Sequence, residues 1–413
     1  MYPNKDVIDQ IKTIRKQKGI TQNELAKLTG LKQTAIARIE NHHMSPTINM
    51  LNRILDALGM VLTIENYKKI NKHLNIVLDM HGCPNRCKHC WLGELPNNCL
   101  DDEYAEFIVK IFKPYFKEVT FYSWLREPDY CNDYKTRWIK DNELSSVKPQ
   151  RFELASFYKI VRDSEYAKWL KEIGTKKVQL TFFGSEKTTD EFVGRRGAYQ
   201  ELIKASEILK DNDIEPRWQI FIYETNKNEV IELLKIAKEM EIKEILVHEG
   251  SCDGNNRKLY NIRINKNNIP DEVKPYYLDY PNILSEKECI NILKNDESYF
   301  VPHNNDEITI IITSDLNIYF NFTNPSPVWK IGNIKDDDID DIVRKIVEED
   351  ILALIMARSV RIKDLINLYG DTKSDKVFSV EDYKMFLLNN YLDENYNLKY
   401  DMQKLVNEIK NRR

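Results

Sequence analysis

Apolar positions along the chain follow two different periods. In residues 7–40 they recur every three or four positions, as on the buried face of amphipathic helices. From residue 74 to residue 247, short apolar runs typical of strands alternate with helical segments. The pattern predicts a multidomain chain in which a small all-α domain precedes an α/β domain with a parallel sheet.

Three helices are expected in the first forty residues. The first covers residues 7–18, and the second begins after Thr21, which can form a capping box with Glu24. The third covers residues 33–40. Two short helices joined by a glycine-containing turn form a helix-turn-helix.

The α/β region begins after a charged linker at residues 65–72. Strands are expected over residues 74–78, 118–122, 177–183, 218–222 and 244–247, with helices over residues 103–116, 199–209 and 227–240. Catalytic side chains in such a fold lie at the carboxyl ends of the strands.

Two further regions carry weaker patterns. Residues 129–166 are rich in Trp, Tyr and charge and predict a lid or a helix pair. Near the end of the chain, residues 307–320 predict a hairpin with its turn at Asp315, followed by acidic helices. The expected domains are residues 1–66, 73–265 and 266–413.

Charge is distributed unevenly over the 413 residues. The net charge is −4, but residues 1–60 contain nine Lys and Arg against five Asp and Glu, which leaves −8 for the rest. This asymmetry favours a nucleic-acid contact at the N-terminal domain. The sequence has no signal-peptide pattern and no run of eighteen apolar residues, so a soluble cytoplasmic protein with reduced cysteines is expected.

Three of the seven cysteines, Cys83, Cys87 and Cys90, stand in a C-x3-C-x2-C spacing after an apolar run. Thiolates this close in sequence suit a soft metal or an iron–sulfur cluster. Three ligands leave one iron of a [4Fe-4S] cluster open, and an open position is typical of catalytic centres. The alternative is a zinc knuckle that also uses His81 or His89.

With His89 and Trp91 beside its last cysteine, this motif resembles that of the radical S-adenosylmethionine (SAM) enzymes. The resemblance implies a partial (β/α)6 barrel, a [4Fe-4S] cluster whose open iron is chelated by SAM, and a reductant such as flavodoxin or ferredoxin. In that family the reduced cluster splits SAM into methionine and a 5'-deoxyadenosyl radical, which abstracts hydrogen from the substrate. A peptide, a small metabolite or a nucleic-acid component would each be a compatible substrate.

Further segments follow in the order that this resemblance implies. Trp124-Leu-Arg-Glu-Pro128 is similar to the Gly-Gly-Glu-Pro element that holds the SAM amino group, although Leu125 and Arg126 replace both glycines. The resemblance implies that SAM is bound by Glu127, Thr181, Asp190, Arg195, Arg196 and Gln219. Among these, Asp190 would cap the loop.

Two segments after the last expected barrel strand have open roles. Residues 248–254 either hold substrate, with Cys252 as hydrogen donor or extra cluster ligand, or form a tight turn. The hairpin at residues 307–320 is similar to the tail of radical SAM peptide maturases, in which cysteines hold auxiliary clusters. Residues 316–413 contain no cysteine, so such a cluster is not expected here.

Residues 21–41 and the sequence that follows resemble the lambda-repressor (Cro-like) family of helix-turn-helix domains. The resemblance implies that Gln22 meets a phosphate, and that base edges are reached by Gln33, Thr34 and Arg38. His42 stands where many relatives have glycine. A strand is expected over residues 60–64. In antitoxin-like members of the family such a strand pairs with the same strand of a second copy, which implies a homodimer. The alternative is that the domain no longer binds DNA and serves only in dimerisation or protein contacts.

These observations predict a radical SAM enzyme fused to a DNA-binding domain, without a membrane contact. One alternative is a transcription regulator that senses the cluster or SAM without turnover. Another is a DNA-binding protein stabilised by zinc.

Overall fold

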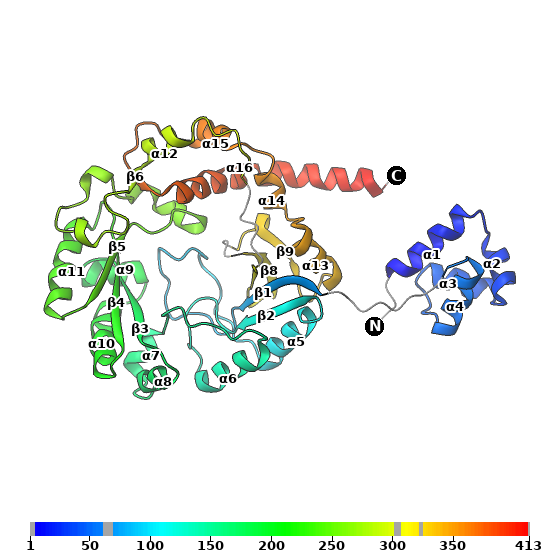
Figure 1. Ribbon diagram of the computed structural model, residues 1–413, viewed down its shortest axis with the longest axis horizontal. Helices are drawn as coiled ribbons and strands as arrows, with labels where there is room; N and C mark the ends of the chain where they lie inside the picture. The colour runs from blue at the N-terminus through cyan, green and yellow to red at the C-terminus, as the bar shows by residue number, and fades with distance from the viewer. Residues whose placement is uncertain (1–4, 61–68, 301–306, 322–324, 412–413) are drawn as a thin grey trace. The chain divides into compact units, whose positions relative to one another are not determined.

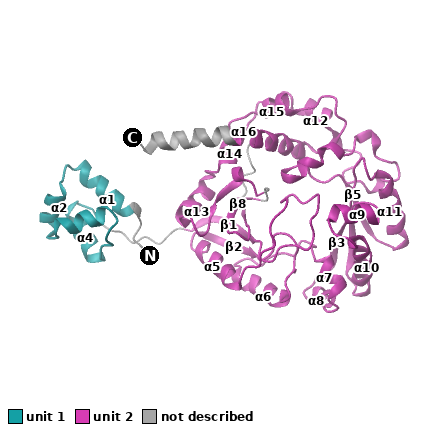
Figure 2. Ribbon diagram, turned by 180° about the vertical axis from the view of Figure 1, so that it is seen from behind, with its two compact units in different colours: residues 1–68 teal, residues 69–413 magenta. Residues whose placement is uncertain are grey.

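In the computed structural model, residues 5–60, 69–300, 307–321 and 325–411 are described. The chain forms two compact units, residues 1–68 and residues 69–413 (Figure 2). A small helical unit followed by an α/β unit confirms the predicted fold class.

The first unit consists of helices that pack around one apolar core: α1 (Lys5–Gln17), α2 (Gln22–Thr29), α3 (Gln33–Glu40) and α4 (Ile48–Ala57). The predicted capping box is present, because Thr21 and Glu24 each accept a hydrogen bond from the other's backbone N–H. His42 adopts a φ of +59°, the left-handed region that glycine enters most easily, which explains why glycine is usual at this position. The strand expected over residues 60–64 falls outside the described residues, except for Met60.

The second unit contains two main sheets. One has the strand order β2-β1-β7-β8-β9 and the other the order β3-β4-β5, while β6 (Leu284–Ser285) and β10 (Val377–Phe378) form a short separate pair. The strands of the main sheets are β1 (Ile70–Leu78), β2 (Phe116–Tyr122), β3 (Lys177–Phe182), β4 (Glu215–Phe221), β5 (Glu244–His248), β7 (Glu307–Ile312), β8 (Asn317–Phe320) and β9 (Lys330–Asn333).

Helices connect these strands and cover them (Figure 1). The α-helices are α5 (Asp102–Phe112), α6 (Tyr134–Leu144), α7 (Phe157–Arg162), α8 (Tyr166–Glu172), α9 (Glu186–Val193), α10 (Ala198–Asp211), α11 (Lys227–Glu239), α12 (Glu286–Leu293), α13 (Ile339–Glu348), α14 (Leu352–Ala357), α15 (Ile362–Tyr369) and α16 (Val380–Asn411). Four 3-10 helices complete the unit over the described residues: η1 (Gly254–Ile262), η2 (Lys266–Asn268), η3 (Lys274–Tyr276) and η4 (Pro327–Trp329).

Parallel pairing brings the carboxyl ends of neighbouring strands together. Strand β1 is parallel to β2 on one side and to β7 on the other, with Val77 opposite Tyr122 and Ile311. Strands β3, β4 and β5 are also parallel, with Thr181 opposite Gln219. All five predicted strands and their helices are therefore present.

The resemblance implied a partly closed barrel, and in the described part of the chain its hydrogen-bonded strands fall into two sheets. Strands β2 and β3 are not hydrogen-bonded neighbours in the described part of the chain. The segment between them contains α6, which packs on β2, followed by α7 and α8, so the insertion at residues 129–166 is helical. The domain boundary expected at residue 266 falls inside the second unit, because β7 pairs with β1.

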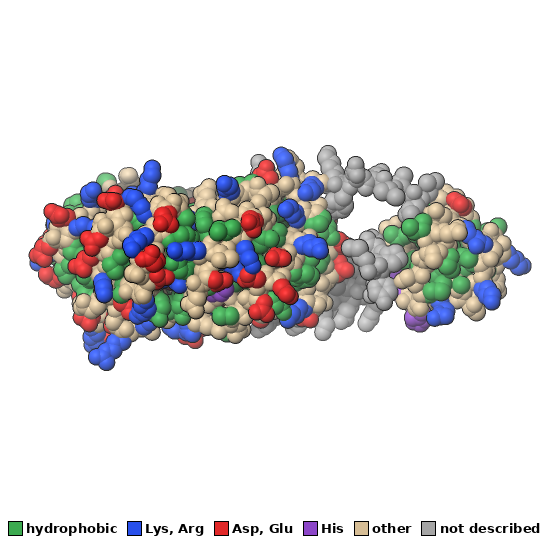
Figure 3. Space-filling model, turned by 90° about the horizontal axis from the view of Figure 1, so that it is seen from below, with side chains coloured by type: hydrophobic (Ala, Val, Ile, Leu, Met, Phe, Trp, Pro, Cys, Tyr) green, Lys and Arg blue, Asp and Glu red, His purple; other side chains and the backbone are tan. Residues whose placement is uncertain are grey.

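The core of the second unit follows its sheets. Most apolar residues of β1, β2 and β7 are buried, among them Phe121 and Ile310. Around β3 and β4, Trp218 stacks on Phe182 with ring centroids 4.1 Å apart. On the face in Figure 3, basic and acidic side chains are interspersed over this unit. No helix in the described ranges has the length and apolar character needed to cross a membrane.

Candidate functional site

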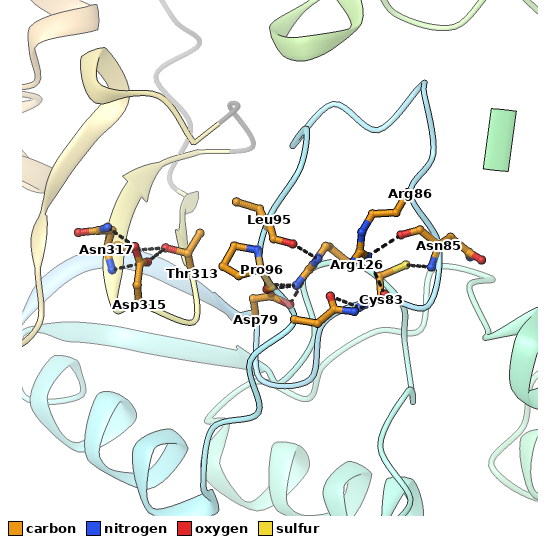
Figure 4. Close-up of polar contacts among 11 residues, drawn as sticks. Asp79, Cys83, Asn85, Arg86, Leu95, Pro96, Arg126, Thr313, Asp315 and Asn317 are labelled. Atoms are coloured by element: carbon orange, nitrogen blue, oxygen red, sulfur yellow. Dashed lines mark hydrogen bonds and ion pairs between the residues drawn. The ribbon is translucent and has the colours of Figure 1, made fainter. Parts of the chain in front are cut away.

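The cysteine motif lies in residues 79–101, which join β1 to α5 and contain no helix or strand. In Figure 1 this segment lies between the two sheets. A connection of this length without regular structure is uncommon in a compact domain and is usually functional. Its first residue, Asp79, is buried and forms an ion pair with Arg126, which follows β2 (Figure 4).

Backbone contacts fix the middle of this loop. The N–H groups of Arg86 and Lys88 donate to the carbonyl oxygens of Val193 and Phe192, at 2.9 and 2.7 Å. These carbonyls belong to the last turn of α9, where carbonyls lack helical partners. Asn255 on η1 donates to the Cys90 carbonyl at 2.8 Å. The cysteine loop is therefore held both by α9 and by η1.

All three cysteines line one cavity of about 470 Å³. The cavity is lined by the cysteine loop, the segment after β2, the ends of β3 and β4, and η1. Glu127, Thr181 and Gln219 line it as well, so three of the six residues that the SAM resemblance singled out lie beside the cysteines.

Burial raises the pKa of the three thiols. The pKa of Cys83 rises to about 12 through burial and the charge of Glu127. The pKa of Cys87 rises further, because burial is joined by the charges of Cys83 and Cys90. Three thiolates in this cavity would repel one another, and a cationic metal centre removes that cost by binding them.

The donor set is compatible with a [4Fe-4S] cluster. Within the described residues, no group of three His, Cys, Asp or Glu side chains is arranged to hold one metal ion. In a [4Fe-4S] cluster each thiolate binds a different iron, so the sulfurs do not have to converge on one point. His81, a candidate zinc ligand, faces a different cavity of about 10 Å³ together with Ser123, Arg137 and Asp141.

Glu127 brings a carboxyl group to the wall of the cysteine cavity. Its Oε1 atom is buried and has no hydrogen-bond partner. Burial raises the pKa of this carboxyl to about 7, while Ser156 and the charge of Arg195 act in the opposite direction. A buried carboxyl oxygen without a partner is costly, and a ligand amino group in the cavity would satisfy it.

A row of polar side chains crosses the carboxyl ends of β3, β4 and β5. Gln219 Oε1 accepts hydrogen bonds from Gln179 at 2.6 Å and from Thr181 at 3.2 Å. Gln219 Nε2 lies 2.5 Å from His248 Nε2. The Gly250 N–H donates to His248 Nδ1 at 3.0 Å.

His89 forms an aromatic wall of the same cavity. Its ring lies 4.6 Å from that of Phe183 and 5.1 Å from that of Phe221, measured between centroids. Its Nδ1 atom is buried without a partner, and burial together with His248 lowers its pKa to about 4. A neutral imidazole that lies tilted against two phenyl rings offers both a flat apolar face and an unused polar atom.

Three of the expected SAM residues are not among those lining the cavity. Asp190 caps helix α10, because its carboxylate accepts from the N–H groups of Gly197 and Tyr199 at 2.5 and 2.9 Å. Arg195 donates to Asn85 Oδ1 at 2.9 Å and forms an ion pair with Glu201 at 2.6 Å. Arg196 is exposed. A direct role for these three in SAM binding therefore stays a prediction, and their observed contacts shape the neighbouring loop.

The loop at residues 248–254 is tied to the C-terminal helix. The Cys252 N–H donates to Asp382 Oδ1 at 2.6 Å, and Arg263 bridges the Gly250 carbonyl and Asp382 Oδ2, at 2.9 and 2.6 Å. Cys252 is buried in the apolar core and is not among the residues lining the cysteine cavity. These contacts favour a structural role for the cysteine.

The second candidate site is the surface of α3 in the first unit. Thr34 and Arg38 are exposed on it, and Gln33 is half-buried. Gln33 Nε2 donates to Gln22 Oε1 at 3.0 Å, so the first residues of α2 and α3 are joined. These are the four residues predicted to contact DNA, and they lie on one surface because α2 packs on α3.

A buried ion pair supports this surface. Arg15 on α1 donates through Nε and Nη2 to both oxygens of Glu40, at 2.6 and 2.8 Å. Glu40 also accepts from Gln22 Nε2 at 2.8 Å. Glu40 is 1 % exposed, and its partners lower the pKa of the buried carboxyl. Gln22 is thereby oriented between the ion pair and Gln33.

Sequence reasoning missed several residues that shape the two sites. Asp79, Asn255 and the Arg15–Glu40 pair were not predicted, and Arg126 was noted only as a departure from glycine. Their partners are 25 to 165 positions away. A buried charge directly after an apolar strand, as at Asp79, is the one signal that could have drawn attention to them.

Solved structures that resemble the chain include radical SAM proteins. The structure described as native anSMEcpe with bound AdoMet aligns with 82 % of this chain and all of its own, at a TM-score of 0.44 and 14 % identity. Streptococcus suis SuiB bound to precursor peptide SuiA aligns with 69 % of this chain and 70 % of its own, at a TM-score of 0.35 and 14 % identity. Both TM-scores are below 0.5.

Sequence comparison identifies the first unit. The family described as helix-turn-helix matches residues 11–64. An uncharacterised HTH-type transcriptional regulator of Haemophilus influenzae is 41 % identical over 58 residues, which are 14 % of this chain and 59 % of the regulator, less than two thirds of its length. Antitoxin HipB of Escherichia coli K12 is 34 % identical over 64 residues, which are 16 % of this chain and 73 % of HipB. Through its N-terminal unit, the chain belongs to the helix-turn-helix family.

Proposed function

We propose that the second unit is a radical SAM enzyme, in which Cys83, Cys87 and Cys90 hold a [4Fe-4S] cluster. The observation that carries the proposal is the single cavity that contains the three thiols of a C-x3-C-x2-C motif together with the unpartnered carboxyl oxygen of Glu127. When bound and reduced by an external electron donor, such a cluster would supply the electron for cleavage of SAM into methionine and a 5'-deoxyadenosyl radical.

The chain's own residues would bind and orient SAM beside the cluster. Glu127 would accept hydrogen bonds from the SAM amino group, which favours the ionised carboxylate despite its burial. Thr181 and Gln219 supply further polar atoms to the wall of the cavity, and His89 supplies a flat face. Displacement of water from this cavity by SAM and substrate would protect a reactive radical from side reactions.

The deciding experiment measures 5'-deoxyadenosine. Protein reconstituted anaerobically with iron and sulfide is mixed with dithionite and SAM, and the product is quantified. We expect 5'-deoxyadenosine from the wild-type protein and none from Cys83→Ala, Cys87→Ala or Cys90→Ala. Cys99→Ala is the matched control, since Cys99 is exposed and lies in the same loop outside the motif.

Two other outcomes would favour the alternatives. A brown protein that forms no 5'-deoxyadenosine but changes its DNA affinity with cluster content would be a regulator that senses the cluster. A colourless protein with one tightly bound zinc would contradict the cluster and favour a zinc-stabilised DNA-binding protein.

We also propose that the first unit binds DNA as part of a homodimer. The exposed side chains of Thr34 and Arg38 on α3, next to the ordered pair Gln22 and Gln33, support this function. A helix-turn-helix module gains useful affinity when a second copy reads an adjacent half-site. This binding would direct the enzyme to a locus or let it regulate its own expression.

Selection from a random-sequence duplex pool by the full-length protein tests this function. Anisotropy of the selected duplex at two salt concentrations then gives its affinity. We expect Arg38→Ala to weaken binding by about tenfold or more, which corresponds to the 1–3 kcal/mol of a base contact. Recovery of no sequence above background would contradict specific DNA binding and leave dimerisation as the role of this unit.

A further inference from the structure

Arg126 connects both ends of the cysteine loop. It follows β2, and its guanidinium group reaches the loop that follows the neighbouring strand β1 (Figure 4). Nη2 and Nε lie 2.7 and 3.3 Å from the two carboxylate oxygens of Asp79, at the start of the loop. Nη1 and Nη2 also donate to the carbonyl oxygens of Leu95 and Pro96, near its end, at 3.0 and 2.9 Å.

The Asp79–Arg126 pair is almost fully enclosed. Its side chains are 2 % and 6 % exposed, respectively. A buried ion pair of this kind contributes to structure only when the geometry satisfies both groups, as the four contacts of Arg126 do here. A planar guanidinium can donate to a carboxylate and to two carbonyls at once, whereas a lysine ammonium presents a single point of charge.

Asn97 extends these contacts to the first thiol. Its Nδ2 donates to the Cys83 carbonyl at 2.7 Å, and its Oδ1 accepts from the Cys83 N–H at 3.2 Å. The preceding residue, Gly82, makes this close approach possible. A Cβ atom at Gly82 would lie 2.5 Å from Asn97 Oδ1 and 3.0 Å from Arg126 Nη2. Asp79, Arg126, Pro96, Asn97 and Cys83 therefore form one continuous set of contacts.

We propose that Arg126 is a positioning residue that, paired with Asp79, presets the cysteine loop so that its thiols can receive the cluster. This inference rests on the proposed function of the second unit and adds a residue to it. Closing the loop in advance lowers the conformational entropy that cluster binding has to remove. Arg126, one of the two residues that replace glycine in the Gly-Gly-Glu-Pro pattern, would thus have a role of its own.

The main test compares cluster retention in two arginine variants. Arg126→Lys keeps the positive charge but loses the planar guanidinium group that donates to several acceptors at once. Arg263→Lys is the matched control: Arg263 is also buried, at 3 % side-chain exposure, and donates to Asp382 and a backbone carbonyl. After anaerobic reconstitution, iron release to a chelator is followed by the loss of absorbance near 400 nm, and urea unfolding measures the stability of each variant.

We expect Arg126→Lys to release iron at least fivefold faster than the wild type. Arg263→Lys should release iron at the wild-type rate, even if it loses as much stability as Arg126→Lys or more. Asp79→Asn should give a smaller acceleration, since an amide oxygen can still accept from Arg126. A wild-type release rate in Arg126→Lys, or the same acceleration in Arg263→Lys, would overturn the proposal.

A second readout separates this inference from the proposed function. In the protein without metal, the rate at which a thiol reagent modifies Cys83, Cys87 and Cys90 reports how firmly the loop is held, with peptide mass spectrometry distinguishing each site. We expect Arg126→Lys to raise these rates at least threefold relative to Arg263→Lys. If the wild-type protein binds no cluster, the proposed function fails, while this measurement still decides whether Arg126 holds the loop. If Arg126→Lys leaves the rates of thiol modification unchanged, Arg126 does not hold the cysteine loop.

Discussion

Each unit contains a buried arginine–carboxylate pair beside its candidate site, and the two pairs hold different kinds of structure. Arg15 and Glu40 lie on helices α1 and α3, whose backbones are already fixed by helical hydrogen bonds. Arg126 and Asp79 lie outside the strands, and they hold a loop without helix or strand. The first pair adjusts a side chain on a formed scaffold, whereas the second determines the path of the backbone itself.

The largest expected effect comes from breaking the helical pair. Glu40→Ala leaves Arg15 charged and buried, which should lower the free energy of unfolding of the first unit by about 3–5 kcal/mol. All six tryptophans lie in the second unit, so tryptophan fluorescence during urea unfolding reports that unit alone. We expect circular dichroism to show an earlier transition while the fluorescence transition stays in place. Coincident shifts of both signals would contradict independent units.

A buried carboxyl without a full ion-pair partner sharpens the comparison. Asp141 is 2 % exposed, its Oδ1 has no hydrogen-bond partner, and burial raises its pKa from 3.8 to about 7. Between these values the folded protein keeps a proton that the unfolded chain releases, so its contribution to stability falls as the pH rises from about 4 to 7.

Asp141→Asn should remove this dependence. Because one pKa unit corresponds to about 1.4 kcal/mol, the variant should gain about 2–3 kcal/mol relative to the wild type between pH 5 and pH 7. Urea unfolding followed by tryptophan fluorescence at both pH values measures the difference. Parallel pH profiles of the two proteins would show that Asp141 is already ionised at pH 5.

The smallest expected effect separates orientation from stability in the first unit. Gln22→Ala removes the link between Glu40 and Gln33 but leaves the Arg15–Glu40 pair intact. We expect affinity for a selected duplex to fall about tenfold, or about 1.4 kcal/mol, with a much smaller change in stability. Gln10→Ala is the control, since Gln10 is exposed on α1. Equal affinities of the two variants would mean that Gln22 does not orient the reading surface.

The sequence was most informative where structure depends on near neighbours. Capping by Thr21 and the span of α3 were predicted residue by residue, because helix caps and helical periodicity involve positions three or four apart. The strands of the α/β unit were found for the same reason, with ends displaced by up to four residues.

Contacts between distant segments could not be predicted in this way. Arg126 reaches Asp79 across 47 positions, and Asn255 reaches Cys90 across 165. Such pairs depend on which strand ends become neighbours, and apolar periodicity is the same for several strand orders. The interruption between β2 and β3 was missed for this reason too, since each strand alone matches the pattern of a barrel strand.

The position of β1 between β2 and β7 has a consequence for folding. Strand β2 follows β1 by about forty residues, but β7 begins at Glu307, more than two hundred residues later. During synthesis one edge of β1 stays unpaired until those residues have been made, and pairing of such long sequence separation is slow. The strand that leads into the cysteine loop is therefore completed late, so cluster insertion during translation would meet a half-formed sheet, whereas the helical unit can already be folded.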